Sequence, residues 1–222
     1  MKRFFNETII NRLKQTRVMA VLVIENPKNA VPVAQALLEG GIDVMELALR
    51  TPSSLEALKL IVKEVPDMLA GAGTILSPAQ LDLARQAGAA FGVSPGFSED
   101  VLSEALKLRF PFAPGILTPS ELEGALSFGC RTVKIFPAQV SGGAAYIKAI
   151  YAPYKHLQVQ FLPLGGLTLD NIEDYLQYDF ITAVGGSWIA PANLIADENW
   201  SLITERASAA VKKAQKIQKS SH

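Results

Sequence analysis

The sequence has little cysteine and little histidine. Cys130 is the single cysteine, so no disulfide can form within the chain, and the two histidines, His156 and His222, are far apart. Transition-metal sites are built mainly from clustered cysteine and histidine ligands, and no such spacing occurs in this sequence. We therefore expect a protein without a bound metal or a disulfide framework, as is usual in a reducing cytoplasm.

A charge of one sign and long apolar runs are also lacking. The 21 lysines and arginines balance 21 aspartates and glutamates, whereas a nucleic-acid-binding protein usually has a basic face. The lysines at 212, 213, 216 and 219 have a spacing that predicts the solvated face of a last helix. No apolar run approaches the roughly 20 residues of a membrane span, and residues 1–7 lack the apolar core of a signal peptide. Nucleic-acid and membrane partners are not expected.

Apolar residues are plentiful, since 49% of the 222 residues are hydrophobic and 19% are charged. Short segments rich in Val, Ile, Leu and Phe alternate with stretches of helical periodicity. There are eight such segments, at 18–24, 43–49, 69–75, 91–95, 111–116, 132–136, 160–164 and 181–184. Strands that are apolar almost without interruption are typical of parallel sheets covered by helices.

The stretches between these segments carry helix signals. Apolar residues at 30, 33, 34, 37 and 38 lie on one helical face, which Gly40 then ends. Ser53 and Glu56 have the spacing of a capping box, and Ser77 and Thr118 are each followed by proline, as at many helix starts. Each expected strand is therefore followed by an expected helix.

The eight strand–helix units predict a single-domain α/β protein, a (β/α)8 TIM barrel. An open doubly wound sheet usually has about five or six strands and fits less well. We expect an N-terminal helix within residues 1–16, the barrel over 17–190, and a C-terminal helix and tail over 191–222. Functional residues of such barrels lie at the carboxyl ends of the strands and in the loops that follow.

Two charged residues, Glu46 and Lys134, lie inside predicted strands. Burying an unpaired charge is costly, so each group must pair or lose its charge. A neutral lysine amine in an apolar pocket is a nucleophile that can form a Schiff base with a ketone. Strand alternation puts Arg50 on the same face as Glu46, roughly 13 Å further along, where it could bind an anion. The alternatives are a buried structural ion pair and a solvated arginine at a strand end.

Glycine pairs at 165–166 and 185–186 follow the last two expected strands. Barrels frequently build phosphate sites there, from backbone amides that glycine leaves uncovered. Either pair alone could simply form a tight turn. The two pairs together with the hydroxyl group of Ser187 favour a phosphate site.

The chain contains, in order, Glu46, Arg50, Gly71-Ala72-Gly73-Thr74, Ser94-Pro95-Gly96, Lys134-Ile135-Phe136-Pro137-Ala138 and Gly185-Gly186-Ser187-Trp188. In this it resembles the KDPG/KHG aldolase family over residues 15–210. The resemblance implies a class I aldolase, a lyase of carbohydrate metabolism that needs no metal or other cofactor. Its substrate would be a phosphorylated 2-keto acid, 2-keto-3-deoxy-6-phosphogluconate, cleaved to pyruvate and glyceraldehyde 3-phosphate in the Entner–Doudoroff pathway. It also implies a cytoplasmic homotrimer.

The resemblance assigns a role to each matching residue. Lys134 would form the Schiff base, and Glu46 would be the acid and base. Of the expected substrate-binding residues, Arg50 and Thr74 would hold the pyruvate carboxylate. Pro95 and Phe136 would line the pocket, and Gly166, Gly186 and Ser187 would hold the distal phosphate, with Leu164 and Gly165 beside them.

Leu164 departs from the family pattern. Phosphogluconate-cleaving members usually have Pro-Thr-Gly-Gly where this chain has Pro163-Leu164-Gly165-Gly166. The threonine faces the substrate and takes part in stereochemical choice, and a lost hydrogen bond there costs about 0.5–1.5 kcal/mol. Members that act on the galactonate epimer have an aliphatic residue at this place, but they lack the Arg50-like and Gly-Ser-Trp elements.

Other functions remain open. The same chemistry on another 2-keto acid, such as cleavage of 4-hydroxy-2-oxoglutarate or decarboxylation of oxaloacetate, needs Lys134 but no phosphate site. A phosphosugar isomerase or epimerase would use the glycine pairs without an imine. A non-catalytic barrel that binds a small keto acid or phosphate would keep Glu46 and Lys134 as structural partners.

Overall fold

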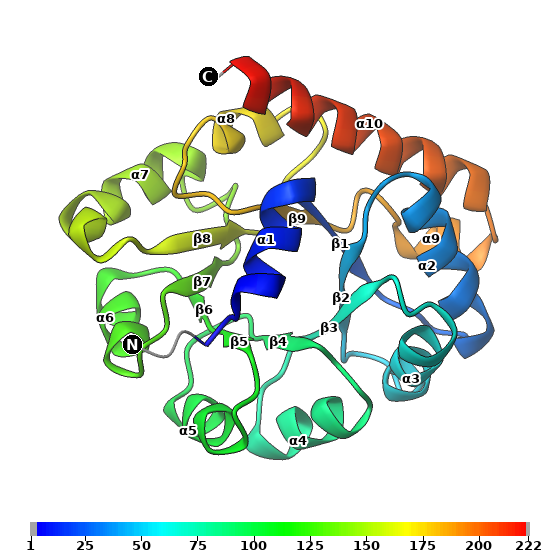
Figure 1. Ribbon diagram of the computed structural model, residues 1–222, viewed down its shortest axis with the longest axis horizontal. Coiled ribbons are helices and arrows are strands. Elements are labelled where there is room, and N and C mark those ends of the chain that lie inside the picture. Colours follow the sequence, from blue (N-terminus) through cyan, green and yellow to red (C-terminus); the bar gives the residue numbers. More distant parts are fainter. Residues whose placement is uncertain (1–3, 221–222) are drawn as a thin grey trace.

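The computed structural model describes residues 4–220, and the side chains of residues 4–217. Its strands lie around the centre of the molecule, most of its helices surround them, and the N-terminal helix lies across the centre of the view (Figure 1). The expected N-terminal segment 1–16 contributes helix α1 (Glu7–Thr16). Residues 1–3, His222 and the side chain of Lys219 lie outside the described part of the chain.

The strands pair in parallel wherever they form ladders. In chain order they are β1 (Val18–Leu22), β2 (Val44–Ala48), β3 (Leu69–Gly73), β4 (Phe91–Val93), β5 (Phe112–Ala113), β6 (Gly115–Ile116), β7 (Thr132–Ile135), β8 (Gln160–Pro163) and β9 (Val184–Gly186).

The other helices lie on the outside of the molecule (Figure 1). They are α2 (Ala30–Glu39), α3 (Ser54–Glu64), α4 (Pro78–Gln86), α5 (Glu99–Leu108), α6 (Pro119–Ser127), α7 (Gly143–Tyr154), α8 (Ile172–Leu176), α9 (Ala192–Ala196) and α10 (Trp200–Ser220), with short 3-10 helices at Pro27–Asn29 and Lys155–Leu157.

The expected α/β class with parallel strands is confirmed, but the strands do not form one closed eight-stranded ladder. A six-stranded sheet has the order β5-β4-β3-β2-β1-β9, and a three-stranded sheet has the order β6-β7-β8. The fifth expected strand is divided at Pro114, which has no amide hydrogen to donate to a ladder. Between β8 and β9 there are only isolated bridges, one of which joins Leu164 to Gly185.

Side chains alternate between an inner and an outer apolar cluster. In β1, Val18, Ala20 and Leu22 belong to the outer cluster under the helices, whereas Met19 and Val21 belong to the inner one. This is the alternation that a strand covered on both faces requires.

Helix α1 closes the amino-terminal end of the strands. Its residues Ile9 and Leu13 are buried in the inner cluster. Arg12 Nε forms an ion pair of 2.7 Å with Asp43, the residue before β2. The opposite end, where the strands have their carboxyl termini, is therefore the end left for a site.

Two of the expected helix caps form and one does not. Thr118 and Glu121 make a capping box at the start of α6, and Ser77 caps α4. The capping box expected for Ser53 is wrong, because no side chain caps α3 and the Ser53 hydroxyl donates to the carbonyl of Ile24 at 2.9 Å instead. The hydroxyl that the local spacing predicts for the helix start therefore bonds to a neighbouring loop instead.

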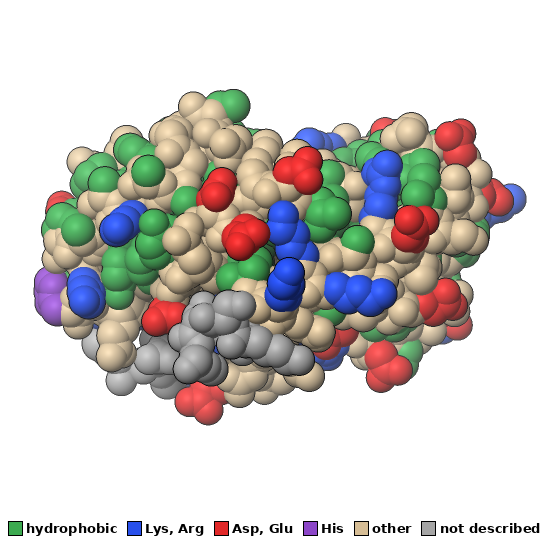
Figure 2. All heavy atoms as spheres, turned by 90° about the horizontal axis from the view of Figure 1, so that it is seen from above, with side chains coloured by type: hydrophobic (Ala, Val, Ile, Leu, Met, Phe, Trp, Pro, Cys, Tyr) green, Lys and Arg blue, Asp and Glu red, His purple; other side chains and the backbone are tan. Residues whose placement is uncertain are grey.

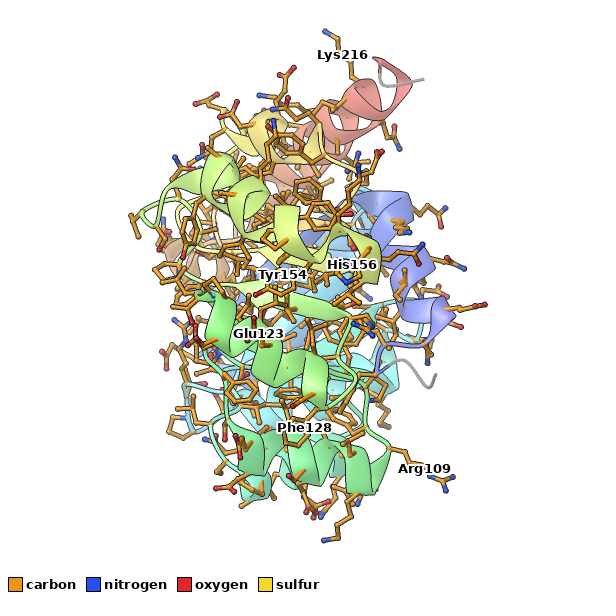
Figure 3. The ribbon with its side chains drawn as sticks, turned by 90° about the vertical axis from the view of Figure 1, so that its left-hand side faces the viewer. Arg109, Glu123, Phe128, Tyr154, His156 and Lys216 are labelled. Carbon is orange, nitrogen blue, oxygen red and sulfur yellow. The ribbon has the colours of Figure 1, made fainter. Side chains whose placement is uncertain are left out.

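The outer surface carries charges of both signs. Basic and acidic side chains are interspersed on the face seen in Figure 2. On the side shown in Figure 3, Tyr154 of α7 lies beside Glu123 of α6, and its hydroxyl donates to the carboxylate at 2.7 Å. Within the described residues, no helix is long and apolar enough to cross a membrane, and no three His, Cys, Asp or Glu side chains are grouped as metal ligands.

Cys130 gives a prediction about this packing. Burial raises the pKa of its thiol to about 12 from an ordinary value of 9.0. We expect the native protein to react very slowly with a chromogenic thiol reagent at pH 8, and the protein unfolded in denaturant to react at once, because the thiolate is the nucleophile. A raised pKa favours the folded state below pH 9, and this contribution is lost as the pH rises toward 12. Rapid labelling of the native protein would contradict this placement of Cys130.

Candidate active site

Lys134 and Glu46 meet in the interior of the molecule. Lys134 Nζ, from β7, lies 2.9 Å from Glu46 Oε1 and 3.1 Å from Oε2 on β2. Their side chains are 6% and 1% exposed. The charges are paired, so their burial is compensated, and the short contact allows a proton to pass between the amine and the carboxylate.

Glycines of β3 leave space for the Glu46 carboxylate. A methyl group at Gly73 would overlap the carboxylate, and one at Gly71 would overlap the ring of Phe91. The register places Glu46 opposite Gly71 and Ala48 opposite Gly73. At Gly71 and Gly73, strand β3 therefore has no side chain on the face where β2 carries its acid.

Phe136 borders the lysine. Its ring centroid lies 5.6 Å from Lys134 Nζ, within the range of a cation–π contact. The amine thus has a carboxylate and an aromatic ring as neighbours. A planar group bonded to Nζ could pack against that ring.

Arg50 lies in the loop that follows β2 and is exposed. Its Nε donates to Thr74 Oγ1 at 3.3 Å, and no described carboxylate forms an ion pair with its guanidinium group. Thr74 has a φ of 60°, a left-handed conformation that is uncommon for a residue other than glycine. Backbone strain held next to an arginine with no carboxylate partner is consistent with a functional site.

These side chains border a cavity of about 380 Å³ at the carboxyl ends of the strands. The expected site residues lie on its wall, with two exceptions. Thr74 contacts the wall through its hydrogen bond with Arg50, and Pro95 packs against Gly115 instead. The lining residues are Val21, Val23, Glu46, Arg50, Lys134, Phe136, Leu164, Gly165, Gly166, Leu167, Gly185, Gly186, Ser187, Trp188 and Pro191.

Sequence reasoning missed part of this wall, namely Val21, Val23, Leu167, Trp188 and Pro191. Strand alternation could have identified Val21, because it follows the inward-facing Met19 at an interval of two. In the sequence, Trp188 was singled out only as the last residue of the motif Gly185-Gly186-Ser187-Trp188. Its indole lies over Gly186 so closely that a methyl group there would overlap it.

The pair at 185–186 lies inside β9, not after the strand as expected. A Cβ atom on Gly185 would be 2.7 Å from Leu164 Cγ. Glycine at this position is therefore explained by the close approach of a neighbouring side chain. Leu164, which departs from the family pattern, therefore packs directly against Gly185 of β9.

The pair at 165–166 forms a turn, which we call the glycine turn. Gly165 and Gly166 have φ angles of 92° and 77°, a conformation that glycine adopts without strain. The carbonyl of Gly165 accepts from the amide of Gln139 at 3.0 Å, away from the cavity. The amides of Gly166 and Leu167 donate to no group within residues 4–220. Successive unbonded amides in a turn can bind an anion.

The cavity thus combines two kinds of chemistry. One part holds an amine, a carboxylate and a guanidinium group, and the other holds glycine amides and the hydroxyl of Ser187. A molecule with a keto acid at one end and a phosphate at the other would match both parts.

Comparison with known proteins gives the same picture. Residues 9–206 match the family described as Aldolase: KDPG and KHG aldolase. The chain is 43% identical to the 2-dehydro-3-deoxy-phosphogluconate aldolase of Dickeya dadantii, over 87% of this chain and 90% of that protein. It is 40% identical to the KHG/KDPG aldolase of Escherichia coli K12, over 89% and 92%.

Solved structures agree. A KDPG aldolase from Legionella pneumophila, with pyruvate captured as a covalent carbinolamine, superposes with a TM-score of 0.87 at 41% identity, covering 90% of this chain and 97% of that one. The 2-keto-3-deoxy-6-phosphogluconate aldolase of Zymomonas mobilis ZM4, with 3-phosphoglycerate, gives 0.84 at 39% identity, covering 91% and 94%.

The buried pair gives a stability prediction. Glu46→Gln and Lys134→Met should each lower the free energy of unfolding by about 3–5 kcal/mol, because each leaves an uncompensated buried charge. The double variant should lose less than the sum. Denaturant unfolding of the four proteins measures this coupling.

The exposed pair Lys63 and Glu64, 2.7 Å apart with side chains 78% and 47% exposed, is the matched control. Lys63→Met and Glu64→Gln should show no measurable coupling, since water screens exposed charges. Additive losses at Glu46 and Lys134 would mean that the two groups do not depend on each other.

Proposed function

Because the chain belongs to the KDPG and KHG aldolase family, we propose that it cleaves 2-keto-3-deoxy-6-phosphogluconate to pyruvate and glyceraldehyde 3-phosphate through a Schiff base. Like its relatives it is an aldolase, a lyase of carbon–carbon bonds. The observation that carries the proposal is Lys134, with its amine 2.9 Å from Glu46 at the wall of the cavity. Residues 1–222 act as one domain whose two sheets work together as a barrel.

Lys134 forms the covalent intermediate. Its Nζ gives a proton to Glu46 and attacks the C2 ketone as a neutral amine. The resulting carbinolamine loses its hydroxyl group as water when Glu46 returns the proton. The iminium that remains withdraws electrons from the C3–C4 bond.

Glu46 then acts as the base. Directly or through one water, its carboxylate takes the proton of the C4 hydroxyl group. The electrons of the C3–C4 bond move to the iminium, so that glyceraldehyde 3-phosphate leaves and an enamine stays on Lys134. Glu46 returns the proton to C3, and water hydrolyses the imine to release pyruvate and the lysine ammonium.

The remaining residues bind the two ends of the substrate. Arg50, with Thr74, holds the pyruvate carboxylate, and Phe136 borders the imine. Pro95, which was expected beside the imine, packs against Gly115 and does not line the cavity. Gly166, Gly186 and Ser187, with Leu164 and Gly165 beside them, form the phosphate end. The carbinolamine in the Legionella relative and the 3-phosphoglycerate in the Zymomonas relative support the two halves of this assignment.

A second substrate is favoured by the relatives named KHG/KDPG aldolase. Cleavage of 4-hydroxy-2-oxoglutarate uses the same amine and carboxylate but no phosphate. We propose it as a lesser activity of the same site.

We also propose a homotrimer. A chain 28% identical to this one, with a TM-score of 0.82, forms part of a protein cage designed from symmetric oligomeric domains. Leu76 and Val140, which are 60% and 80% exposed, offer apolar surface for contact between copies.

Borohydride reduction in the presence of pyruvate tests the mechanism. We expect one pyruvate-sized adduct per chain by intact mass, located on Lys134 by peptide mapping, because only an imine is reduced to a stable bond. Lys134→Met should give no adduct, whereas the exposed-lysine variant Lys148→Met should give the full amount. An adduct spread over surface lysines, or none, would return Lys134 and Glu46 to a structural pair.

Leu164 is expected to control the choice at C4. Leu164→Thr restores a hydroxyl group to the wall, and the preference for 2-keto-3-deoxy-6-phosphogluconate over its C4 epimer should rise about three- to tenfold, the value of one hydrogen bond. The ratio of kcat/KM for the two substrates measures it. Leu164→Val, which has the shape of threonine without the hydroxyl, should leave the ratio near that of the parent; an equal rise in both variants would assign the effect to size.

A further inference from the structure

Three residues outside the cavity wall hold the glycine turn in place. They are Gln139, in the loop after β7, and Asn171 and Tyr175, at the start and within helix α8. None of them borders the cavity. Any effect they have on a bound substrate must therefore pass through the turn or through the loop that carries Gln139.

Gln139 is the centre of this group. Its backbone amide donates to the carbonyl of Gly165 at 3.0 Å. Its side-chain Oε1 accepts from the hydroxyl of Tyr175 at 2.6 Å and from Asn171 Nδ2 at 3.3 Å. Both ends of the residue are thus bonded, one to the turn and the other to helix α8.

Asn171 holds the other half of the turn. Its Nδ2 also donates to the carbonyl of Gly166 at 3.1 Å, and its Oδ1 accepts from the amide of Thr168 at 2.8 Å. Since the carbonyls of Gly165 and Gly166 are both engaged on the protein side, their peptide planes are fixed. The amides of Gly166 and Leu167 are left to face an anion.

The packing around the turn is tight. A Cβ atom on Gly166 would lie 2.7 Å from Gln139 Cβ, and one on Gly165 would lie 3.0 Å from the ring of Phe136. Tyr175 is fully buried, and this burial raises the pKa of its hydroxyl to about 12, so that it stays a donor at neutral pH. Gln139 and Phe136 therefore leave no room for a side chain on either glycine of the turn.

The loop that carries Gln139 also carries Phe136, which borders Lys134. The amide of Ala138 donates to the carbonyl of Leu164 at 2.7 Å, next to the bond from Gln139. One short segment therefore connects the imine half of the cavity to the phosphate half. The distance between the two halves depends on how this segment is held.

We propose that Gln139, held by Tyr175 and Asn171, is a positioning residue that sets the glycine turn for the substrate's distal phosphate. The group thereby sets the preference of the site for phosphorylated over unphosphorylated keto acids. This inference rests on the proposed aldolase function and names the residues that determine its specificity for phosphate.

Tyr175→Phe tests the inference by removing one hydroxyl group. We expect KM for 2-keto-3-deoxy-6-phosphogluconate to rise about three- to tenfold, as for the loss of one hydrogen bond, with kcat within about twofold. Pyruvate has no phosphate, so the pyruvate concentration that gives half-maximal borohydride trapping on Lys134 should not change. Gln139→Ala, which removes both side-chain contacts, should raise KM further in the same selective way.

Tyr178→Phe is the matched control. Tyr178 lies just after α8 and stacks on Phe180 at 5.0 Å between ring centroids, and its hydroxyl donates to no described residue. The same chemical change there should leave KM for 2-keto-3-deoxy-6-phosphogluconate and the half-maximal pyruvate concentration for trapping as in the parent. A general loosening of the helix would instead move the pyruvate constant together with KM.

The outcomes separate the two proposals. If the parent protein neither traps pyruvate nor cleaves the phosphorylated substrate, the aldolase function fails and this inference fails with it. If the parent does both, and Tyr175→Phe and Gln139→Ala leave KM unchanged or shift the pyruvate constant equally, only the positioning role is overturned.

Discussion

The buried pair of Lys134 and Glu46 is the interaction on which the rest of the structure depends. Two charges in an apolar interior are tolerated only when they are paired at short distance, and here the pair joins strands from the two different sheets. Space for the acid comes from Gly73, which has no side chain to overlap it. The same pairing that makes burial possible keeps a base within reach of the amine.

The fold directs this pair to one end of the molecule. Helix α1 closes the amino-terminal end with Ile9 and Leu13, so that the cavity forms where the strands end. The strand break at Pro114 does not interrupt the contact to β7, since the Pro114 carbonyl accepts from the amide of Lys134 at 2.9 Å. Both sheets therefore contribute to one continuous wall of the site, although their ladders are separate.

The glycine turn adds a second constraint. An anion site made of backbone amides has no side chain of its own to orient it, so its geometry depends on what bonds to the carbonyls behind it. Here Gln139 and Asn171 supply those bonds. Because Phe136 lies in the same loop as Gln139, the two halves of the cavity share one support.

The sequence by itself determined the alternation of parallel strands and helices, the burial of Lys134 and Glu46, and the family. These follow from local patterns, because periodicity and a charge within an apolar strand can be read without knowing what lies opposite. The helix cap at Thr118 was predictable for the same reason, because its partner Glu121 lies three residues further along the chain. The division of a strand at Pro114 could also be read from the sequence, because proline has no amide hydrogen to donate to a ladder. Only the tertiary structure decided that Ser53 bonds a distant loop, that Gly185 lies inside a strand under Leu164, and that Gln139 meets Tyr175. Each of these depends on a contact between segments far apart in the chain, and such contacts leave no local pattern to read.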